Sequence, residues 1–233
     1  MILFMLAGGF AGAAYAEIII KSSVSPEFPD GLHAKYLRYI AEKAELPIEI
    51  FPMPFARRVA SLKNGEINLM VGLKSSYPEL QFKFLQPSYE RTGGVYFVRS
   101  DSQNLSTTKP NFGELVVAFS INHKEMLGWA NDNFRAVVTL SSLEQKIMML
   151  EKRRIDAFVH FQSSANYKIK QLGLEGVIVP ATYQSPRANL PYHFAINEKS
   201  DLFSLRKRLE TIISEGVKAG DFAKIRYNHE ASL

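Results

Sequence analysis

Polar and basic residues stand directly after three of the apolar segments that the sequence predicts as strands. They are Lys74 and Ser75 after residues 67–71, Ser120, Asn122 and His123 after residues 115–119, and His160 and Gln162 at the end of the segment that follows Asp156. Open α/β sheets bind ligands at the carboxyl ends of their strands, so these positions predict contacts to a small polar molecule. The turn at residues 120–123 also leads into a predicted helix, whose free N–H groups could hold an anion. For His123 an ordinary surface position is the alternative.

The sequence carries none of the common motifs of catalytic or cofactor sites. Cysteine is absent, which excludes disulfides, thiolate catalysis and cysteine metal ligands. The five histidines are far apart along the chain and show no metal-ligand spacing. There is no nucleophile elbow, phosphate-binding loop or dinucleotide-binding glycine turn. We therefore predict a binding role without catalysis, cofactor or metal.

A helix followed by a strand positions the first of these polar groups. The helix is predicted by one apolar stripe, formed at i, i+4 and i+7 by Phe55, Val59 and Leu62. Gly65 ends it, because glycine tolerates the left-handed cap conformation. A short apolar strand then runs to Gly72, where the polar loop begins.

The same arrangement recurs in the second half of the chain. Residues 149–160 repeat the order of residues 61–72, with a helix end, a tight polar turn, an isoleucine, an Asp or Asn, and an apolar strand. The repeat predicts two α/β lobes of similar build that face each other. Strands at residues 95–98 and 192–196 are the predicted crossings between them.

The N-terminal part of the chain predicts a strand–helix–strand unit. Strands at residues 17–22 and 47–51 flank a helix that Asp30 caps, which makes the first sheet largely parallel. Ser141 or Ser142 caps the corresponding helix of the second lobe.

The composition, 46% hydrophobic and 22% charged, is that of an ordinary globular protein. The net charge of +5 is spread along the chain, so it favours anionic partners weakly and does not indicate nucleic-acid binding. The basic run at residues 206–208 is typical of a solvated helix face.

The first sixteen residues predict an export signal. Residues 1–13 are apolar and small, and Ala14, Tyr15 and Ala16 fit the small-x-small pattern of a cleavage site. The segment is too short to span a bilayer as a helix, and it lacks the usual positively charged start. A buried N-terminal strand or a tail is the alternative. We predict a signal peptide over residues 1–16 and a periplasmic mature protein.

Several motifs, taken in order, resemble the extracellular solute-binding proteins of the polar-amino-acid-binding family, which serve ABC importers. They are Asp30-Gly31-Leu32, Asn64-Gly65-Glu66-Ile67-Asn68, Tyr77-Pro78-Glu79, residues 85–89, Arg154-Ile155-Asp156-Ala157 and residues 220–225. The resemblance covers residues 17–228 and implies a type II periplasmic-binding-protein fold. This is an α/β fold of two lobes, each a mostly parallel sheet flanked by helices, joined by two crossing strands. Lobe 1 is expected at residues 17–98 and 190–233, and lobe 2 at residues 99–189.

The resemblance also implies ligand contacts in lobe 1. The family's aromatic-x-Arg at a helix start matches Phe55 and Arg57, so Arg57 is preferred over Arg58, with a solvated surface charge as the alternative. The loop after the following strand lines the ligand in the family, which here implies Leu73, Lys74 and Ser75. Glu27 and Phe28, in the loop after the first strand, complete the expected contacts.

One position departs from the family pattern. In the family, an arginine in the turn after this loop grips the α-carboxylate of the ligand, and here Leu80 stands in its place. Leucine cannot make a bidentate contact to a carboxylate, which puts a standard α-amino acid in doubt as the ligand. Lys74 or Arg57 could substitute.

We therefore expect a monomeric binding protein that closes on a small polar or acidic molecule, amino-acid-like or an organic acid, and serves an ABC permease in the inner membrane. Two other functions stay open. One is an enzyme on the same scaffold, a dehydratase of cyclic acids, whose general acid would be Glu27, Asp156 or His160. For Asp156, fixing the turn before its strand is the alternative. The other is a sensor or accessory protein that binds a ligand without transport.

Overall fold

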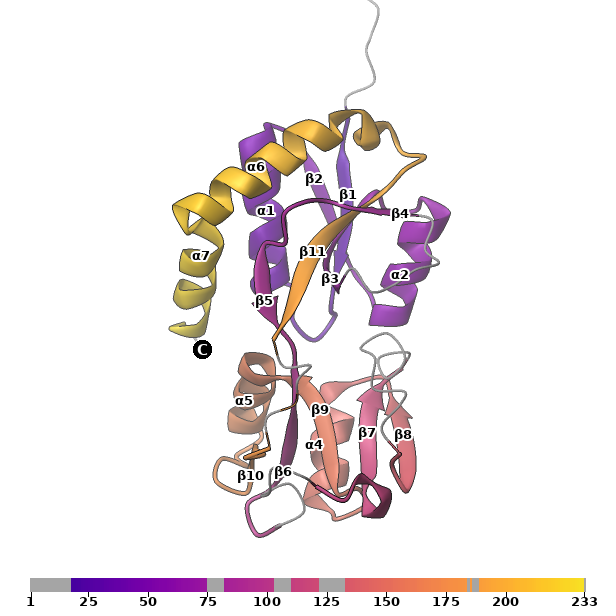
Figure 1. The fold of residues 1–233 in the computed structure, drawn as a ribbon, viewed down its shortest axis with the longest axis vertical. Helices are drawn as coiled ribbons and strands as arrows, with labels where there is room; N and C mark the ends of the chain where they lie inside the picture. The colour runs from indigo at the N-terminus through magenta and orange to yellow at the C-terminus, as the bar shows by residue number, and fades with distance from the viewer. Residues whose placement is uncertain are drawn as a thin grey trace, which may run out of the picture.

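The chain folds into two α/β lobes that lie one above the other along the long axis of the molecule (Figure 1). The computed structural model describes residues 18–74, 82–102, 110–121, 133–183, 185 and 189–232. Among these residues, no helix has the length and apolar character needed to cross a membrane.

The described residues of lobe 1 form two small sheets and five helical segments. Strands β1 (Ile20–Val24) and β2 (Ile48–Pro52) pair in parallel. The second sheet has the order β3 (Leu69–Lys74), β11 (Leu190–Asn197), β4 (Phe82–Phe84), and β5 (Glu90–Thr92) pairs with β11 as well. The helices are α1 (Leu32–Ala44), α2 (Phe55–Asn64), the 3₁₀ turn η3 (Asp201–Leu205), α6 (Arg206–Ala219) and α7 (Asp221–Glu230).

Lobe 2 is a single five-stranded sheet with helices packed on it. The strand order is β10 (Ile178–Pro180), β6 (Gly94–Arg99), β9 (Ala157–Phe161), β7 (Val116–Ser120), β8 (Ala136–Leu140). The described helices are η1 (Phe112–Glu114), α4 (Leu143–Glu151) and α5 (Gln162–Gln171).

Parallel pairing is found where the chain winds through helices, and antiparallel pairing where it crosses between lobes. Strands β1 and β2 are parallel, and so are β7, β8 and β9. The strands that follow a crossing, β6 and β11, run antiparallel to their neighbours. Because the described pairings of β6 are all within the lobe 2 sheet, the first crossing lies at residues 92–94, a few residues before the expected boundary at residue 98.

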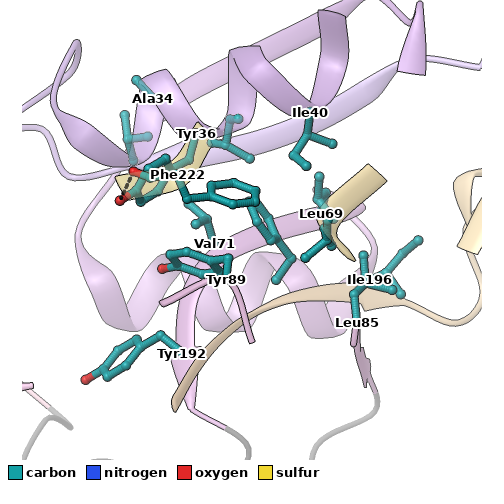
Figure 2. Close-up of a cluster of buried hydrophobic side chains, with 14 of the residues drawn as sticks. Ala34, Tyr36, Ile40, Leu69, Val71, Leu85, Tyr89, Tyr192, Ile196 and Phe222 are labelled. Carbon is teal, nitrogen blue, oxygen red and sulfur yellow. Dashed lines mark hydrogen bonds between the residues drawn. The ribbon is translucent and has the colours of Figure 1, made fainter. Parts of the chain in front are cut away.

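One cluster of buried apolar side chains runs through both lobes. It includes Ile40 of α1 and Leu69 of β3, passes through Tyr192 of β11, and reaches Phe119 and Val159 of lobe 2. Figure 2 shows its lobe 1 part, where Tyr89 and Phe222 lie between α1 and the sheet. A separate cluster lies beneath α2 and contains the predicted stripe of Val59 and Leu62 with Phe55 packed against it.

Most of the predicted helix ends are confirmed. Ser142 caps α4, since its Oγ accepts from the Gln145 N–H at 3.1 Å, and Gly65 ends α2 with φ of +77°. The prediction that Asp30 caps α1 is wrong. Gly31 is the N-cap residue without a side-chain bond, and Asp30 instead pairs with Arg38 at 2.6 Å on the surface.

Candidate functional site

A buried lysine lies at the carboxyl ends of two lobe 2 strands. Lys146, on α4, is fully buried, and its Nζ donates to Ser120 Oγ at 3.0 Å and to the Val159 carbonyl oxygen at 3.1 Å. The same Nζ lies 3.1 Å from His160 Nδ1. An ammonium has three hydrogens, and these three acceptors use all of them.

The positive charge of Lys146 is solvated by neutral groups but not cancelled by an ion pair. Burial lowers the pKa of Lys146 to about 7, and the more distant Glu27 carboxylate acts in the opposite direction. Within the described ranges, no carboxylate pairs directly with Lys146. An anion brought close to this ammonium would raise its pKa.

Two residues of the loop between β1 and α1 reach from lobe 1 to lobe 2. The two carboxylate oxygens of Glu27 accept from the Leu143 N–H at 3.0 and 3.1 Å, at the first residue of α4. The ring of Phe28 packs against lobe 2, with its centroid 6.3 Å from that of Tyr167 on α5. A helix N-terminus stabilises a carboxylate, so this loop holds the two lobes together.

Lobe 1 contributes a buried arginine. Arg58 is 4% exposed, its Nη2 donates to the Val71 carbonyl oxygen at 3.3 Å, and its guanidinium carbon lies 5.9 Å from the centroid of the Phe55 ring. Its Nε has no hydrogen-bond partner in the part of the chain that the structure describes. Burial lowers the pKa of Arg58 to about 10, so the side chain stays charged at neutral pH. A buried charge without a counter-ion is costly, and an anionic ligand would relieve that cost.

Two tyrosine hydroxyls lie buried in the same region. Tyr89 and Tyr192 are 4% and 1% exposed, and neither hydroxyl has a hydrogen-bond partner among the described residues. Tyr89 influences the pKa of Arg58, which places the two groups near each other. Burial raises the pKa of both tyrosines, so both remain neutral O–H donors. Tyr89 stands directly before β5, which leads to lobe 2, and Tyr192 lies on β11, which returns from it (Figure 2).

The ring of Tyr192 also contacts lobe 2. Its centroid lies 5.6 Å from that of Phe161, the last residue of β9 and the neighbour of His160. The two lobes therefore meet at this aromatic contact. Lobe 1 carries Arg58 and the two tyrosines, and lobe 2 carries Lys146, Ser120 and His160.

A buried, neutral histidine also lies in lobe 1. Burial lowers the pKa of His33 to about 3, and the charges of Arg58, Arg226 and His229 act in the same direction. Gly72 has φ of +89°, and a Cβ there would lie 2.5 Å from the His33 ring, so only glycine allows this close approach.

The other residues expected to line lobe 1 lie in different settings. Arg57 is exposed and pairs with Glu66 at 2.7 Å. Leu73 is fully buried in the cluster beneath α2, and Lys74 is 6% exposed at the end of β3. Phe55 begins α2 beside Arg58.

In lobe 2, the structure brings Ser120 and His160 together and places Gln162, exposed, at the first residue of α5. Ser75, Asn122 and His123 lie outside the described residues, as does the turn with Leu80.

Two of the three candidate general acids are engaged with backbone groups. Asp156 Oδ2 accepts from the Val116 N–H at 2.7 Å and lies 3.6 Å from Arg135, which confirms its role in fixing the turn before β9. Glu27 accepts from the start of α4, as described above.

The sequence interpretation missed Lys146 and Tyr192, did not include Tyr89 among the expected ligand contacts, and set Arg58 aside. The available signal was a cation inside an apolar stripe, since Lys146 stands between Leu143 and Ile147.

These residues do not form a metal site, and the polar surface hollow of the molecule lies elsewhere. No described cluster of three or more His, Asp or Glu side chains could hold a metal. A polar hollow of about 420 Å³ is lined by Lys63, Asn64, Gly65, Asn197, Lys199 and Ser200. It lies at the end of β11 remote from lobe 2, so we do not assign the ligand to it.

Comparison with known proteins decides the family. Residues 22–228 match the family model of bacterial extracellular solute-binding proteins, family 3. The chain belongs to this family. The predicted family and the solute-binding role are thereby confirmed, and the family is one of extracellular binding proteins. A search of curated protein sequences found no match.

Solved structures with the same architecture confirm the predicted fold. The ligand-binding core of GluR0 with L-glutamate has a TM-score of 0.75 and 18% identity, over 93% of this chain and 99% of that one. An amino-acid ABC transporter substrate-binding protein from Streptococcus pneumoniae, bound to L-arginine, has a TM-score of 0.74 and 18% identity, over 91% of this chain and 94% of that one. A histidine kinase sensor domain has a TM-score of 0.73 and 19% identity, over 91% of this chain and 96% of that one.

Proposed function

We propose that this solute-binding protein captures a small acidic molecule between its two lobes and delivers it to an ABC importer. The observation that carries the proposal is Arg58, a buried guanidinium with an unused Nε donor and no acidic partner in the described structure. Arginine matches the planar geometry of a carboxylate better than any other side chain. The unpartnered hydroxyls of Tyr89 and Tyr192 supply further donors for the same anion.

This proposal moves the anion anchor from Arg57 to Arg58. The charge of Arg57 is already matched by Glu66 on the surface, and exposed pairs of this kind contribute little to binding. Arg58 replaces the function of the family arginine, whose position Leu80 occupies.

We propose further that the protein is exported and acts in the periplasm. Residues 1–16 act as a signal peptide, and the mature protein is a periplasmic monomer whose lobes comprise residues 17–93 with 190–233, and residues 94–189. Closure of the lobes presents a surface to the permease. A periplasmic sensor would use the same binding site, and loss of solute uptake on deletion of the gene separates transport from sensing.

The two neighbouring arginines provide the test. We expect a screen of organic acids and amino acids to find solutes that raise the melting temperature of the wild type, because binding to the folded state stabilises it. Arg58→Lys should weaken binding of the best acid at least about tenfold, since a point charge cannot replace a bidentate contact to a charged group. The control Arg57→Lys should bind as the wild type does. Equal effects of the two substitutions, measured by calorimetry, would contradict the proposal.

A further inference from the structure

We propose that Lys146 is a positioning residue that makes Ser120 a hydrogen-bond donor toward the solute, which is consequently an organic diacid without an ammonium group. The inference rests on the proposed function, because Arg58 is taken to hold one acidic group. Lobe 2 then receives the second.

The direction of hydrogen bonding follows from the contacts of Lys146. A protonated lysine has three donors and no acceptor, so each of its partners must accept. Ser120 Oγ, 3.0 Å away, accepts from Nζ, and its own hydrogen must point elsewhere. His160 Nδ1, 3.1 Å away, also accepts, which leaves the ring proton on Nε2. The Ser120 hydroxyl, at the end of β7, therefore offers its hydrogen to another partner.

The same contacts disfavour an ammonium group in the solute. The acceptors at these strand ends, including the Val159 carbonyl oxygen, already receive the ammonium of Lys146. Lys146 would also repel a second positive charge nearby. The carboxylate that reaches this part of lobe 2 from the described residues of lobe 1 is that of Glu27, and the α4 backbone binds it.

Lobe 1 shows the same preference for negative charge. Arg58 and the tyrosine hydroxyls are donors, and burial, together with the nearby positive charge of Arg58, lowers the pKa of His33 and keeps it neutral. With donors and positive charge on both lobes, a solute with one acidic group facing each lobe satisfies the site. The chemical class is therefore a short dicarboxylate.

Pairs of compounds that differ only by the amino group test this inference. We expect calorimetry at pH 6, where Lys146 is protonated before binding, to show that glutarate binds the wild type at least tenfold more tightly than L-glutamate, and succinate more tightly than L-aspartate. At pH 8 Lys146 is mostly neutral before binding, because its pKa is about 7, so the diacid should cause proton uptake there, seen as a difference in apparent enthalpy between two buffers. A residue with a merely structural role would not produce this uptake.

Two variants complete the test. Lys146→Met, which is apolar and of similar length, should lose the proton uptake and at least tenfold of the preference for glutarate over L-glutamate. Ser120→Ala should weaken glutarate about tenfold or more while leaving L-glutamate nearly unchanged, as expected for loss of one hydrogen bond to a charged group. If Lys146→Met does not fold, the wild-type preference and Ser120→Ala decide the question.

The outcomes separate the two proposals. Equal or tighter binding of L-glutamate, with binding still lost in Arg58→Lys, would overturn the diacid inference and leave the acidic-solute proposal standing. Failure of every acid to bind the wild type would overturn both. Unchanged preference in a folded Lys146→Met would refute the role of this lysine.

Discussion

Lys146 lies on the side of α4 that packs against the sheet, next to the buried Leu143, Ile147 and Leu150. Moving an ammonium out of water costs several kcal/mol, and its three hydrogen bonds offset only part of that cost. The lowered pKa reflects the remainder, because burial penalises the charged form. The protonation state of this residue is therefore linked to the stability of the fold.

We expect this linkage to appear as a pH dependence that Lys146→Met lacks. The pKa is about 7 in the folded state and 10.5 in the unfolded chain, so between these values the unfolded state binds more protons. The wild type should gain stability relative to Lys146→Met as the pH rises from 7 to 10.5, by at most about 1.4 kcal/mol per pH unit. Urea unfolding at pH 7, 8, 9 and 10 measures this, and a constant difference between the proteins would contradict it.

Only some of the site residues could be predicted from the sequence. Ser120 and His160 were predicted from their places at strand ends, which is a local feature. The choice between Arg57 and Arg58 depends on the Val71 carbonyl, which belongs to another element and has no signature in the sequence near α2. In the same way, Lys146 is buried because residues of β7 and β9 accept its hydrogens.

At the scale of elements, the N-terminus of α4 is stabilised from two sides. Ser142 caps it from its own lobe, and Glu27 accepts from the Leu143 N–H across the lobe boundary. These bonds have different consequences, because only the second depends on the lobes being together.

Substitution of each residue should separate helix stability from closure. We expect Ser142→Ala to lower the free energy of unfolding by about 1 kcal/mol without changing solute affinity. Glu27→Gln should weaken solute binding severalfold, because it removes a charge-assisted contact between the lobes and so depopulates the closed form. Urea unfolding and calorimetry on both variants measure these effects, and an unchanged affinity in Glu27→Gln would contradict the role of this contact.

Helix α7 braces the strand that leads to the first crossing. Glu90 on β5 has a side chain only 11% exposed and receives Arg226 Nε at 3.0 Å and the Tyr36 hydroxyl at 3.0 Å. Burial acts to lower the pKa of Arg226, but the Glu90 carboxylate outweighs it and leaves the pKa above its ordinary value. This pair fixes the C-terminal helix to the part of lobe 1 from which the chain leaves.

Loss of the Arg226–Glu90 ion pair should lower the stability of the protein substantially. We expect Arg226→Gln to lower the free energy of unfolding by about 3 kcal/mol, because it leaves Glu90 buried without its partner. The control is Arg38→Gln, which breaks a pair with Asp30 whose side chains are 52% and 79% exposed and should cost less than about 1 kcal/mol. Similar losses in the two variants, measured by urea unfolding, would contradict this assignment.

Helix features that depend on neighbouring residues were predicted correctly from the sequence, and those that depend on distant residues were not. The apolar stripe of α2 and the caps Gly65 and Ser142 were correct because each depends on residues within one turn of helix. Asp30 failed as a cap because Arg38, two turns along α1, pairs with its carboxylate. The antiparallel strands β6 and β11 follow from the two crossings, which periodicity does not report.

At the scale of the whole molecule, the two lobes are connected by two crossings, by the apolar cluster through Tyr192, and by the loop with Glu27 and Phe28. Each lobe contains a buried cationic donor, Arg58 in lobe 1 and Lys146 in lobe 2. A solute that satisfies them must bind the closed arrangement more tightly than the open one, and this difference in affinity is what drives closure.

Small-angle X-ray scattering with and without the best acidic solute tests this account most directly. We predict that the radius of gyration of the wild type and of Arg57→Lys falls when the acid is added, whereas at the same concentration Arg58→Lys keeps the value of the solute-free protein. A radius that does not change in the wild type at saturation, or that falls equally in Arg58→Lys, would contradict closure on an acid held by Arg58.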